Sequence, residues 1–463
     1  MQVLPTILGV AHPTGYPTYL LLAHVAEFVP VGSVAFRANV LSAIFVALAL
    51  ATVVLIDVRL GVRPLLAAAA ALALGAVGTI WAAATVAEVN PLHLLFAALI
   101  VHRALVWAER RRVCDLAIGG LLVGLSLGNH LLTLAIAPFV ALFVVWAGRR
   151  LFAVRPAWLL VPLVFVAIGL SVYLYIPIRA AQHPALSYNH PTTLDAVMWL
   201  ITGEQFRSQF DFLTSNGPSE LWATLPGLID LAAARSTVLL PILGLIGLVA
   251  LARRKPAVAL LLGALLLAGI YIYANYLRLE HYLLVPWLLV GIAGGVGLET
   301  SAGWIERRAP GWAGGVAAVA FLFAVALAIT NGPVENLSGD RSGDDYLASV
   351  MSSVPRDAVI LSEWDTSTPL WYGQLIAGDR PDVLVIDDSN IVYDGWGTRE
   401  RAIAAFICQR PVFMMRLDEA DLVSTRAAYV LVPFMDVYVA IGGPTAVADR
   451  TIYRVVAPAS CTS

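Results

Sequence analysis

Ten long apolar stretches constrain the fold of this chain more than any other feature of its sequence. They lie at residues 35–58, 64–86, 89–108, 113–129, 131–147, 156–178, 236–252, 256–276, 282–302 and 310–330. An α-helix needs about 20 apolar residues to cross the hydrocarbon core of a bilayer. Charged residues make up only 13% of the chain, which is far below the usual share in soluble domains. The sequence therefore predicts a polytopic α-helical membrane bundle and excludes a disordered, nucleic-acid-binding or ordinary cytosolic protein.

Basic residues divide the loops between these stretches into two sets. One set holds fourteen of them: Arg59, Arg63, Arg103, Arg110, Arg111, Arg112, Arg149, Arg150, Arg155, Arg253, Arg254, Lys255, Arg307 and Arg308. The other set holds five: Arg37, Arg179, Arg207, Arg235 and Arg278. Because cytoplasmic loops are enriched in Arg and Lys, we expect the first set inside and the second outside. The chain is therefore predicted to be a multi-pass protein of the plasma membrane.

A change in charge balance marks a second domain. Residues 1–330 carry 19 basic and 13 acidic side chains, whereas residues 331–463 carry 10 and 18. In the latter, DAVILSEW, RPDVLVIDDS, RPVFMMRL, AAYVLVPF and TIYRVV are typical of buried strands, and the segments near 341–353, 367–378 and 398–408 are typical of helices. This alternation predicts a soluble α/β domain with a largely parallel sheet. By the loop pattern it is extracytoplasmic, as is the large loop 179–235.

Residues 1–34 are predicted to be an external loop and an interfacial helix that precede the bundle of residues 35–330. They lack the basic start, apolar core and cleavage site of a signal peptide. An external segment of this kind normally follows an earlier membrane helix, so we expect one span upstream of Met1.

The three cysteines have no metal-ligand spacing. Cys408 and Cys461 either form a disulfide, which an extracytoplasmic domain allows, or remain free thiols. We expect no cofactor, and no acidic cluster indicates a metal, although a divalent ion is not excluded.

Ionisable residues at the predicted outer face are the candidates for chemistry, because charges near a membrane are costly. Glu88 lies in the short segment AEVNPLH, and it is the only carboxylate between Asp57 and Glu109. A carboxylate at a low-dielectric boundary can have a raised pKa and act as a general base. The alternative is a solvated loop acid or a helix cap.

Other candidates surround this position in the predicted topology. They are His12 and Tyr16 in the loop GVAHPTGYP, Arg37 at the start of a span, Asn129 and His130 between two short spans, and Arg179 at the end of YLYIPIRA. A cation at the membrane surface can hold a phosphate. Their alternatives are interfacial turns, membrane anchors and a capping pair.

Three further groups complete the set. Tyr276, Glu280 and His281 crowd one turn, Glu204 and Gln205 lie in the large external loop, and Asp365 and Trp371 lie in the exterior domain. For Asp365 we favour a structural interpretation, in which it or Thr366 is the N-cap of a helix. No phosphate-binding loop, zinc-protease, serine-hydrolase or dinucleotide motif is present. The outer set of His, Glu, Arg and Tyr instead suits a reaction on a lipid-linked phosphate.

Several motifs resemble a bacterial membrane family catalogued as domain of unknown function 2723. They are LGVAHPTGYPTYLLLAHV, WAAATVAEVNPLH, GLLVGLSLGNHLLTL, TGEQF, YANYLRLEHYLLVP and SGDRSGDDYLASV, and the resemblance covers nearly the whole chain. That family is similar to the eukaryotic transmembrane protein O-mannosyltransferase. The resemblance implies a GT-C type, inverting glycosyltransferase that moves a sugar, such as mannose, from a polyprenyl-phosphate donor to a protein or glycan acceptor on the outer face.

The resemblance also assigns roles to the candidates. Glu88 and His12 are expected to be catalytic, and Arg37, Arg179 and His130 to hold the donor phosphate. Tyr16, Asn129, Glu204, Gln205, Tyr276, Glu280, His281, Asp365 and Trp371 are expected to shape the pocket or bind the acceptor.

The chain departs from the family pattern at its start. Family members show an Asp-x-Gly-Glu-Phe stretch before the segment that matches Val3 to Val10, and here that stretch is absent. Either the start is misassigned, which we favour, or the copy is truncated. Two other functions stay open, a transporter or flippase of lipid-linked glycans and a catalytically inactive receptor or scaffold.

Overall fold

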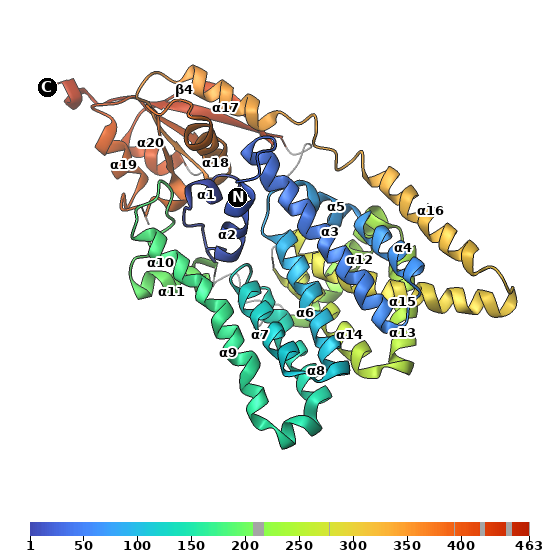
Figure 1. Ribbon diagram of the computed structural model, residues 1–463. Helices are drawn as coiled ribbons and strands as arrows, with labels where there is room; N and C mark the ends of the chain where they lie inside the picture. Colours follow the sequence, from blue (N-terminus) through green and yellow to red (C-terminus); the bar gives the residue numbers. More distant parts are fainter. Residues whose placement is uncertain (207–216, 277, 393, 417–421, 441–446, 463) are drawn as a thin grey trace. The chain divides into compact units, whose positions relative to one another are not determined.

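The computed structural model describes residues 1–206, 217–276, 278–392, 394–416, 422–440 and 447–462, which form two compact units (Figure 1). The first, here called the bundle unit, contains Met1 and residues 13–175 and 199–336. The second, the sheet unit, contains residues 2–12, 176–198 and 337–463. The sheet unit therefore takes in two segments from earlier in the chain, besides nearly all of the predicted exterior domain.

The bundle unit is built from helices. They are α2 (Pro17–Ala26), α3 (Val34–Leu60), α4 (Pro64–Gly75), α5 (Gly78–Thr85), α6 (Asn90–Arg110), α7 (Val113–Leu127), α8 (Thr133–Val154), η1 (Pro156–Leu159), α9 (Leu160–Leu170), η2 (Ser171–Leu174), α12 (Gly217–Ser236), α13 (Leu239–Arg254), α14 (Pro256–Asn275), η4 (Glu280–Leu283), α15 (Leu284–Arg308) and α16 (Ala313–Asn331). The chain passes between the two units within α10 (Tyr175–Ala180) and α11 (Leu194–Thr202).

The described residues include seven helices that are long and apolar enough to cross a membrane, and the number is nine if each of two bent pairs is one span. The bends are 70° between α4 and α5 and 109° between α12 and α13. The predicted stretch 64–86 is therefore broken. Apolarity continues through the break, where Val77 adopts an extended conformation, so composition alone does not reveal it. The predicted stretch 113–129 becomes the shorter helix α7.

Glycines allow two helix pairs of the bundle to approach closely. A Cβ atom on Gly124 of α7 would clash with the carbonyl oxygen of Val166 in α9. A Cβ atom on Gly247 of α13 would clash with the carbonyl oxygen of Ala293 in α15. Small residues at such contacts let helix backbones pack against each other where lipid offers no hydrophobic driving force.

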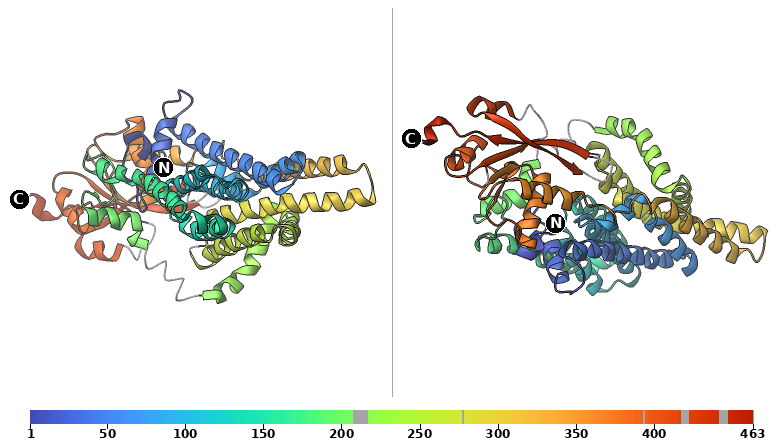
Figure 2. Two further views of the ribbon diagram at one scale, coloured as in Figure 1. Left: turned by 60° about the horizontal axis from the view of Figure 1, so that its bottom comes forward. Right: turned by 90° about the horizontal axis from the view of Figure 1, so that it is seen from above.

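The sheet unit contains a five-stranded sheet in the order β2-β1-β3-β5-β4 (Figure 2, right). The strands are β1 (Val359–Ser362), β2 (Leu384–Asp387), β3 (Val412–Arg416), β4 (Leu431–Ala440) and β5 (Val447–Val455), and all five predicted strand segments are confirmed. The expectation of a largely parallel sheet is wrong. Strand β1 is parallel to β2 and β3, whereas β5 is antiparallel to both β3 and β4. Only six residues separate β4 from β5, which is too few for the crossover that a parallel pair needs, whereas the longer segment with α18 allows β1 and β2 to run parallel.

Helices accompany the strands. They are α1 (Leu4–Ile7), α17 (Ser342–Ser353), α18 (Trp364–Tyr372), η5 (Gly373–Ala377), η6 (Asp388–Asn390), α19 (Arg399–Phe406), α20 (Val423–Ala428) and η8 (Ala459–Thr462). Ile360 and Phe413 on one face of the sheet share a buried core with Val350 of α17. Leu361 on the other face shares a core with Ile403 of α19. Because both faces are covered, β1 and β3 are apolar up to their last residues, Ser362 and Arg416.

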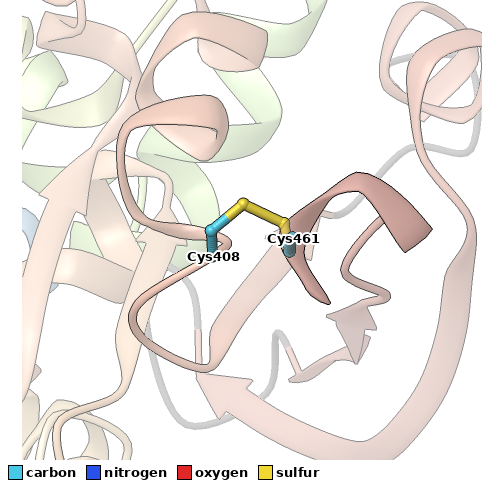
Figure 3. The surroundings of a disulfide bond; sticks show 2 residues. All are labelled: Cys408 and Cys461. Atoms are coloured by element: carbon cyan, nitrogen blue, oxygen red, sulfur yellow. A yellow bond between two sulfur atoms is a disulfide. The ribbon is translucent and has the colours of Figure 1, made fainter. Parts of the chain in front are cut away.

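A disulfide joins Cys408 and Cys461 within the sheet unit, across 53 residues of sequence (Figure 3). Of the two alternatives that the sequence left open, the structure therefore contains the bonded one. Cys114, in the bundle unit, is an exposed free thiol.

Candidate functional site

Glu88 lies in the bundle unit between the end of α5 and the start of α6. Its side chain keeps contact with solvent, but the protein around it removes part of its hydration. This desolvation raises the pKa of the Glu88 carboxyl group above the ordinary glutamate value. A carboxylate with a raised pKa has the basicity that general-base catalysis needs.

The turn between α7 and α8 is tied to the segment that holds Glu88. The buried side-chain amide of Asn129 donates a hydrogen bond of 3.0 Å to the carbonyl oxygen of Val89. The next residue, His130, accepts a hydrogen bond of 3.2 Å from the backbone N–H of Leu132 at its Nδ1 atom. The predicted pair Asn129 and His130 is therefore brought to the same region as Glu88.

Tyr16 and two histidines line up beside this region. The ring centroids of Tyr16 and His130 are 6.3 Å apart, and those of His130 and His93 are 5.3 Å apart. The Tyr16 hydroxyl donates a hydrogen bond of 2.9 Å to the carbonyl oxygen of Pro13. Burial, and secondarily the negative charge of Glu88, raises the pKa of the Tyr16 phenol. Tyr16 is thus a neutral donor within electrostatic reach of Glu88.

A small apolar cavity adjoins His93 in the bundle. Its walls come from α6, α8, α14 and the η4–α15 segment, and they include Tyr282 beside Leu265 and Ile272. The Tyr282 ring lies against the rings of Tyr276 and His281, with centroid separations of 5.3 and 4.5 Å. Tyr282 thereby connects two of the predicted pocket residues, Tyr276 and His281, with the cavity beside His93. We call Glu88, Tyr16, His93, Asn129, His130 and Tyr282 the Glu88 cluster.

Glu280 belongs to a separate ion-pair network in the bundle unit. Its carboxylate lies 2.9 Å from the guanidinium of Arg235, which also lies 2.6 Å from Glu335. Burial raises the pKa of the Glu335 carboxyl group, and the neighbouring Arg235 opposes that rise. Glu280 therefore has a structural partner that its predicted pocket role did not anticipate.

The other predicted residues of the bundle unit lie in the first turn of α3 and in a short helical turn after α11. The Arg37 guanidinium donates a hydrogen bond of 2.8 Å to the carbonyl oxygen of Gly32, in the loop before α3. Glu204 and Gln205 form a short helical turn after Gly203. A Cβ atom on Gly203 would lie 3.7 Å from the Thr14 side chain, so this turn lies beside the loop that holds Tyr16.

His12 and Arg179 belong to the sheet unit. The His12 ring packs edge-on against Trp364, with a centroid separation of 5.2 Å. The Arg179 guanidinium donates hydrogen bonds of 2.8 and 3.2 Å to the carbonyl oxygens of Leu8 and Ile7. Arg179 thus braces the first loop of the chain, a role that its place at the end of an apolar stretch did not reveal.

Asp365 and Trp371 have structural contacts in the sheet unit. Glu363, rather than Asp365 or Thr366, is the N-cap of α18, while Thr366 accepts a hydrogen bond of 3.0 Å from the Glu363 backbone N–H as the third helical residue. The Asp365 carboxylate lies 2.6 Å from the buried guanidinium of Arg450. The Trp371 indole donates to the carbonyl oxygen of Val385 at 3.4 Å and packs on the core.

His93 is the member of the Glu88 cluster to which the sequence interpretation gave no role. It lies inside the predicted stretch 89–108, where a polar side chain is itself a signal of function. Among the described residues, no group of three or more His, Cys, Asp and Glu side chains is placed to hold a metal ion. The roles assigned to the individual site residues stay predictions.

Comparison with known proteins adds a second line of observation. Residues 3–151 match the family described as the N-terminal domain of protein O-mannosyl-transferase TMEM260. The chain is 27% identical over 421 residues to protein O-mannosyl-transferase TMEM260 of Mus musculus, a match that covers 84% of this chain and 58% of the mouse protein. The chain thus spans little more than half the length of that relative. The similarity to O-mannosyltransferases is confirmed, and the label domain of unknown function 2723 stays a prediction.

Two solved structures share the fold. Both are of ArnT from Cupriavidus metallidurans, one bound to undecaprenyl phosphate and one in the apo state. The TM-scores are 0.62 and 0.54, each at 14% sequence identity, and the alignments cover 97% and 98% of this chain and 88% and 89% of the ArnT chains. The predicted GT-C-like membrane bundle with a C-terminal α/β domain is confirmed.

Proposed function

We propose that this chain is a membrane glycosyltransferase that moves a sugar from a polyprenyl-phosphate donor to a hydroxyl acceptor. The Glu88 cluster carries the proposal. It combines a carboxylate of raised pKa with a buried tyrosine and two histidines at the end of an apolar bundle. The similarity to protein O-mannosyl-transferase TMEM260 supports the reaction class, and mannose is accordingly the sugar we propose.

In the proposed reaction the acceptor hydroxyl attacks the anomeric carbon of the donor sugar. Glu88 takes the hydroxyl proton as the new carbon–oxygen bond forms. The bond between the anomeric carbon and the phosphate oxygen breaks, and the polyprenyl phosphate leaves with the electron pair. Attack from the side opposite the leaving group inverts the anomeric configuration.

The departing phosphate needs positive or hydrogen-bonding partners, because negative charge grows on it in the transition state. We assign this role to His130, with Arg37 as the predicted cation of the same unit, whereas Arg179, the other predicted cation, belongs to the sheet unit. One of the two ArnT structures is bound to undecaprenyl phosphate, and this supports a polyprenyl-phosphate donor here.

We further propose that the reaction takes place on the outer face of the plasma membrane and that the sheet unit is extracytoplasmic. The division of basic residues between alternate loops supports this orientation. The Cys408–Cys461 disulfide supports it independently, because disulfides persist in oxidising compartments and are rare in the cytosol.

A transfer assay separates this function from its alternatives. The purified protein is incubated in lipid vesicles with polyprenyl-phosphate mannose and a panel of peptide and glycan acceptors, and both mannosylated acceptor and free polyprenyl phosphate are quantified. A transferase forms the two products in equal amounts. Movement of the donor across the vesicle membrane without product formation would identify a flippase. If neither transfer nor movement of the donor is detected, the scaffold hypothesis is favoured.

A further inference from the structure

The bundle unit contains a second cavity, and none of its lining residues belongs to the Glu88 cluster. Its volume is about 430 Å³, and it lies at the ends of α3, α6 and α8 and the start of α14. Apolar side chains form most of its wall, among them Leu105, Phe143 and Trp146. Three cations also line it, namely Arg111, Arg149 and Lys255. We call it the basic cavity.

The positive charge of the basic cavity is poorly neutralised by the described residues. The Nη1 atom of Arg111 is buried without a hydrogen-bond acceptor. Burial, and then repulsion from Arg149, lowers the pKa of the Arg111 guanidinium, which means that two like charges face each other here. One carboxylate, Glu109, also lines the cavity, but it forms an ion pair with Arg59.

The start of α14 adds to this positive field. Pro256, Ala257 and Val258, the first three residues of the helix, line the cavity. The N-terminal end of a 20-residue helix carries a partial positive charge and is a common binding position for phosphate groups. Three cations and the positive end of a helix dipole therefore line the same cavity.

The apolar wall decides which anion fits. A free phosphate would use the cations but would leave the exposed ring of Trp146 and the half-buried side chain of Leu60 in contact with water. A phospholipid satisfies both parts, because its head group can meet the guanidinium groups while its acyl chains cover the apolar side chains. The Arg149 guanidinium stacks over the Trp146 ring at 5.0 Å, and tryptophan is enriched at membrane interfaces.

We propose that the basic cavity is a binding site for an anionic phospholipid of the leaflet that faces the basic loops. The site is independent of the proposed donor site. Arg111, Arg149 and Lys255 belong to the loop set predicted to be cytoplasmic, whereas Glu88 belongs to the opposite set. Its occupant is a structural or regulatory lipid rather than a substrate.

Lipid binding to the purified full chain tests the proposal by native mass spectrometry and by the shift of the unfolding temperature. The probes are phosphatidylglycerol, phosphatidylcholine with the same acyl chains, and sodium phosphate. The R111Q/R149Q variant removes two cations of the cavity. The R253Q/R254Q variant is the matched control, because it removes two exposed cations of the last turn of α13 that do not line the cavity.

We expect phosphatidylglycerol to bind the unmodified chain and the control with similar affinity, and R111Q/R149Q to bind it at least fivefold more weakly. If both variants lose the same affinity for phosphatidylglycerol, the lipid binds through general surface charge, and the proposal is overturned. Phosphate that binds as tightly as phosphatidylglycerol, or phosphatidylcholine that binds equally well, would also overturn it. If R111Q/R149Q does not fold, R149Q alone, which changes an exposed side chain, provides the same comparison with R253Q.

Discussion

The side-chain amide of Asn129 donates a hydrogen bond to the backbone carbonyl of Val89, the residue that follows Glu88, at a distance of 3.0 Å. This bond joins the turn between α7 and α8 to the start of α6, two places separated by 40 residues. The Asn129 amide and the Val89 carbonyl belong to two different short loops, and the sequence did not indicate that these loops are in contact. The bond fixes the backbone on which the proposed general base is carried.

Asn129→Ala is expected to slow transfer without preventing folding. Loss of a buried hydrogen bond costs about 1–3 kcal/mol of stability, because the Val89 carbonyl is left without its partner. The resulting displacement of Glu88 should lower kcat about tenfold, since each 1.4 kcal/mol in the transition state is a factor of ten. Thermal unfolding and steady-state kinetics measure the two effects.

Asn331→Ala is a matched control for that experiment. The Asn331 amide donates hydrogen bonds to the carbonyl oxygens of Ala76 and Arg235, at 2.7 and 2.8 Å, and neither acceptor residue belongs to the Glu88 cluster. It should lower stability by a similar amount and leave kcat nearly unchanged. Equal kinetic losses in the two variants would show that Asn129 acts only through global stability.

The rate of transfer should depend on pH through Glu88. A general base works in its ionised form, so kcat/KM must fall as the pH drops through the pKa of that group. Desolvation raises the pKa of Glu88, and the acid limb of the profile should therefore lie above pH 4.5, the ordinary glutamate value. A profile that stays flat down to pH 4.5, with the fold intact by tryptophan fluorescence, would exclude Glu88 as the base.

Reduction of the Cys408–Cys461 disulfide should destabilise the sheet unit. Closing a loop of 53 residues removes conformational entropy from the unfolded chain, worth about 4 kcal/mol in the chain-entropy treatment. The C408S/C461S variant should unfold at lower denaturant than the unmodified chain. Cys114→Ser is the control, because that thiol is exposed and unbonded, and it should leave the midpoint unchanged.

Arg450 should be more important for stability than Asp365, its partner. Arg450 is buried between Glu363 and Asp365, at 2.8 and 2.6 Å, whereas the Asp365 side chain is 36% exposed. Arg450→Ala removes the cation from two partly exposed carboxylates, of which Glu363 keeps Arg416 at 3.9 Å, and should cost about 1–3 kcal/mol. Asp365→Asn should cost much less, because Glu363 and water still serve Arg450, and it should leave the KM for acceptor unchanged. A raised KM in Asp365→Asn would instead support the acceptor-binding role.

The helices and strands of this fold were largely predictable because hydrophobic patterning determines them. Long apolar stretches gave the spans, and short apolar runs gave all five strands. The bend between α4 and α5 was not predictable, because Ala76 and Val77 are as apolar as their neighbours. The antiparallel placement of β5 was missed because alternating strands and helices are compatible with more than one strand order.

The candidate site was predictable in its members but not in their partners. Glu88, Tyr16, Asn129 and His130 stood out as polar residues at one end of apolar stretches. The sequence did not reveal that Glu280 is paired with Arg235 or that Arg179 holds two backbone carbonyls, because such contacts join distant segments. His93 was overlooked because it lies inside an apolar stretch rather than at its end.

The central claim is that Glu88 is the general base of a sugar transfer, and single-turnover kinetics of Glu88→Gln test it most directly. The measurement uses saturating polyprenyl-phosphate mannose and acceptor, with Glu306→Gln as the control, since Glu306 pairs with Arg63 near the end of α15 and far from the cluster in sequence. The account predicts a loss of about 10²–10⁴-fold in the rate of Glu88→Gln, the usual contribution of acid–base catalysis, with an unchanged rate for the control. Transfer by Glu88→Gln at the rate of the control would contradict it.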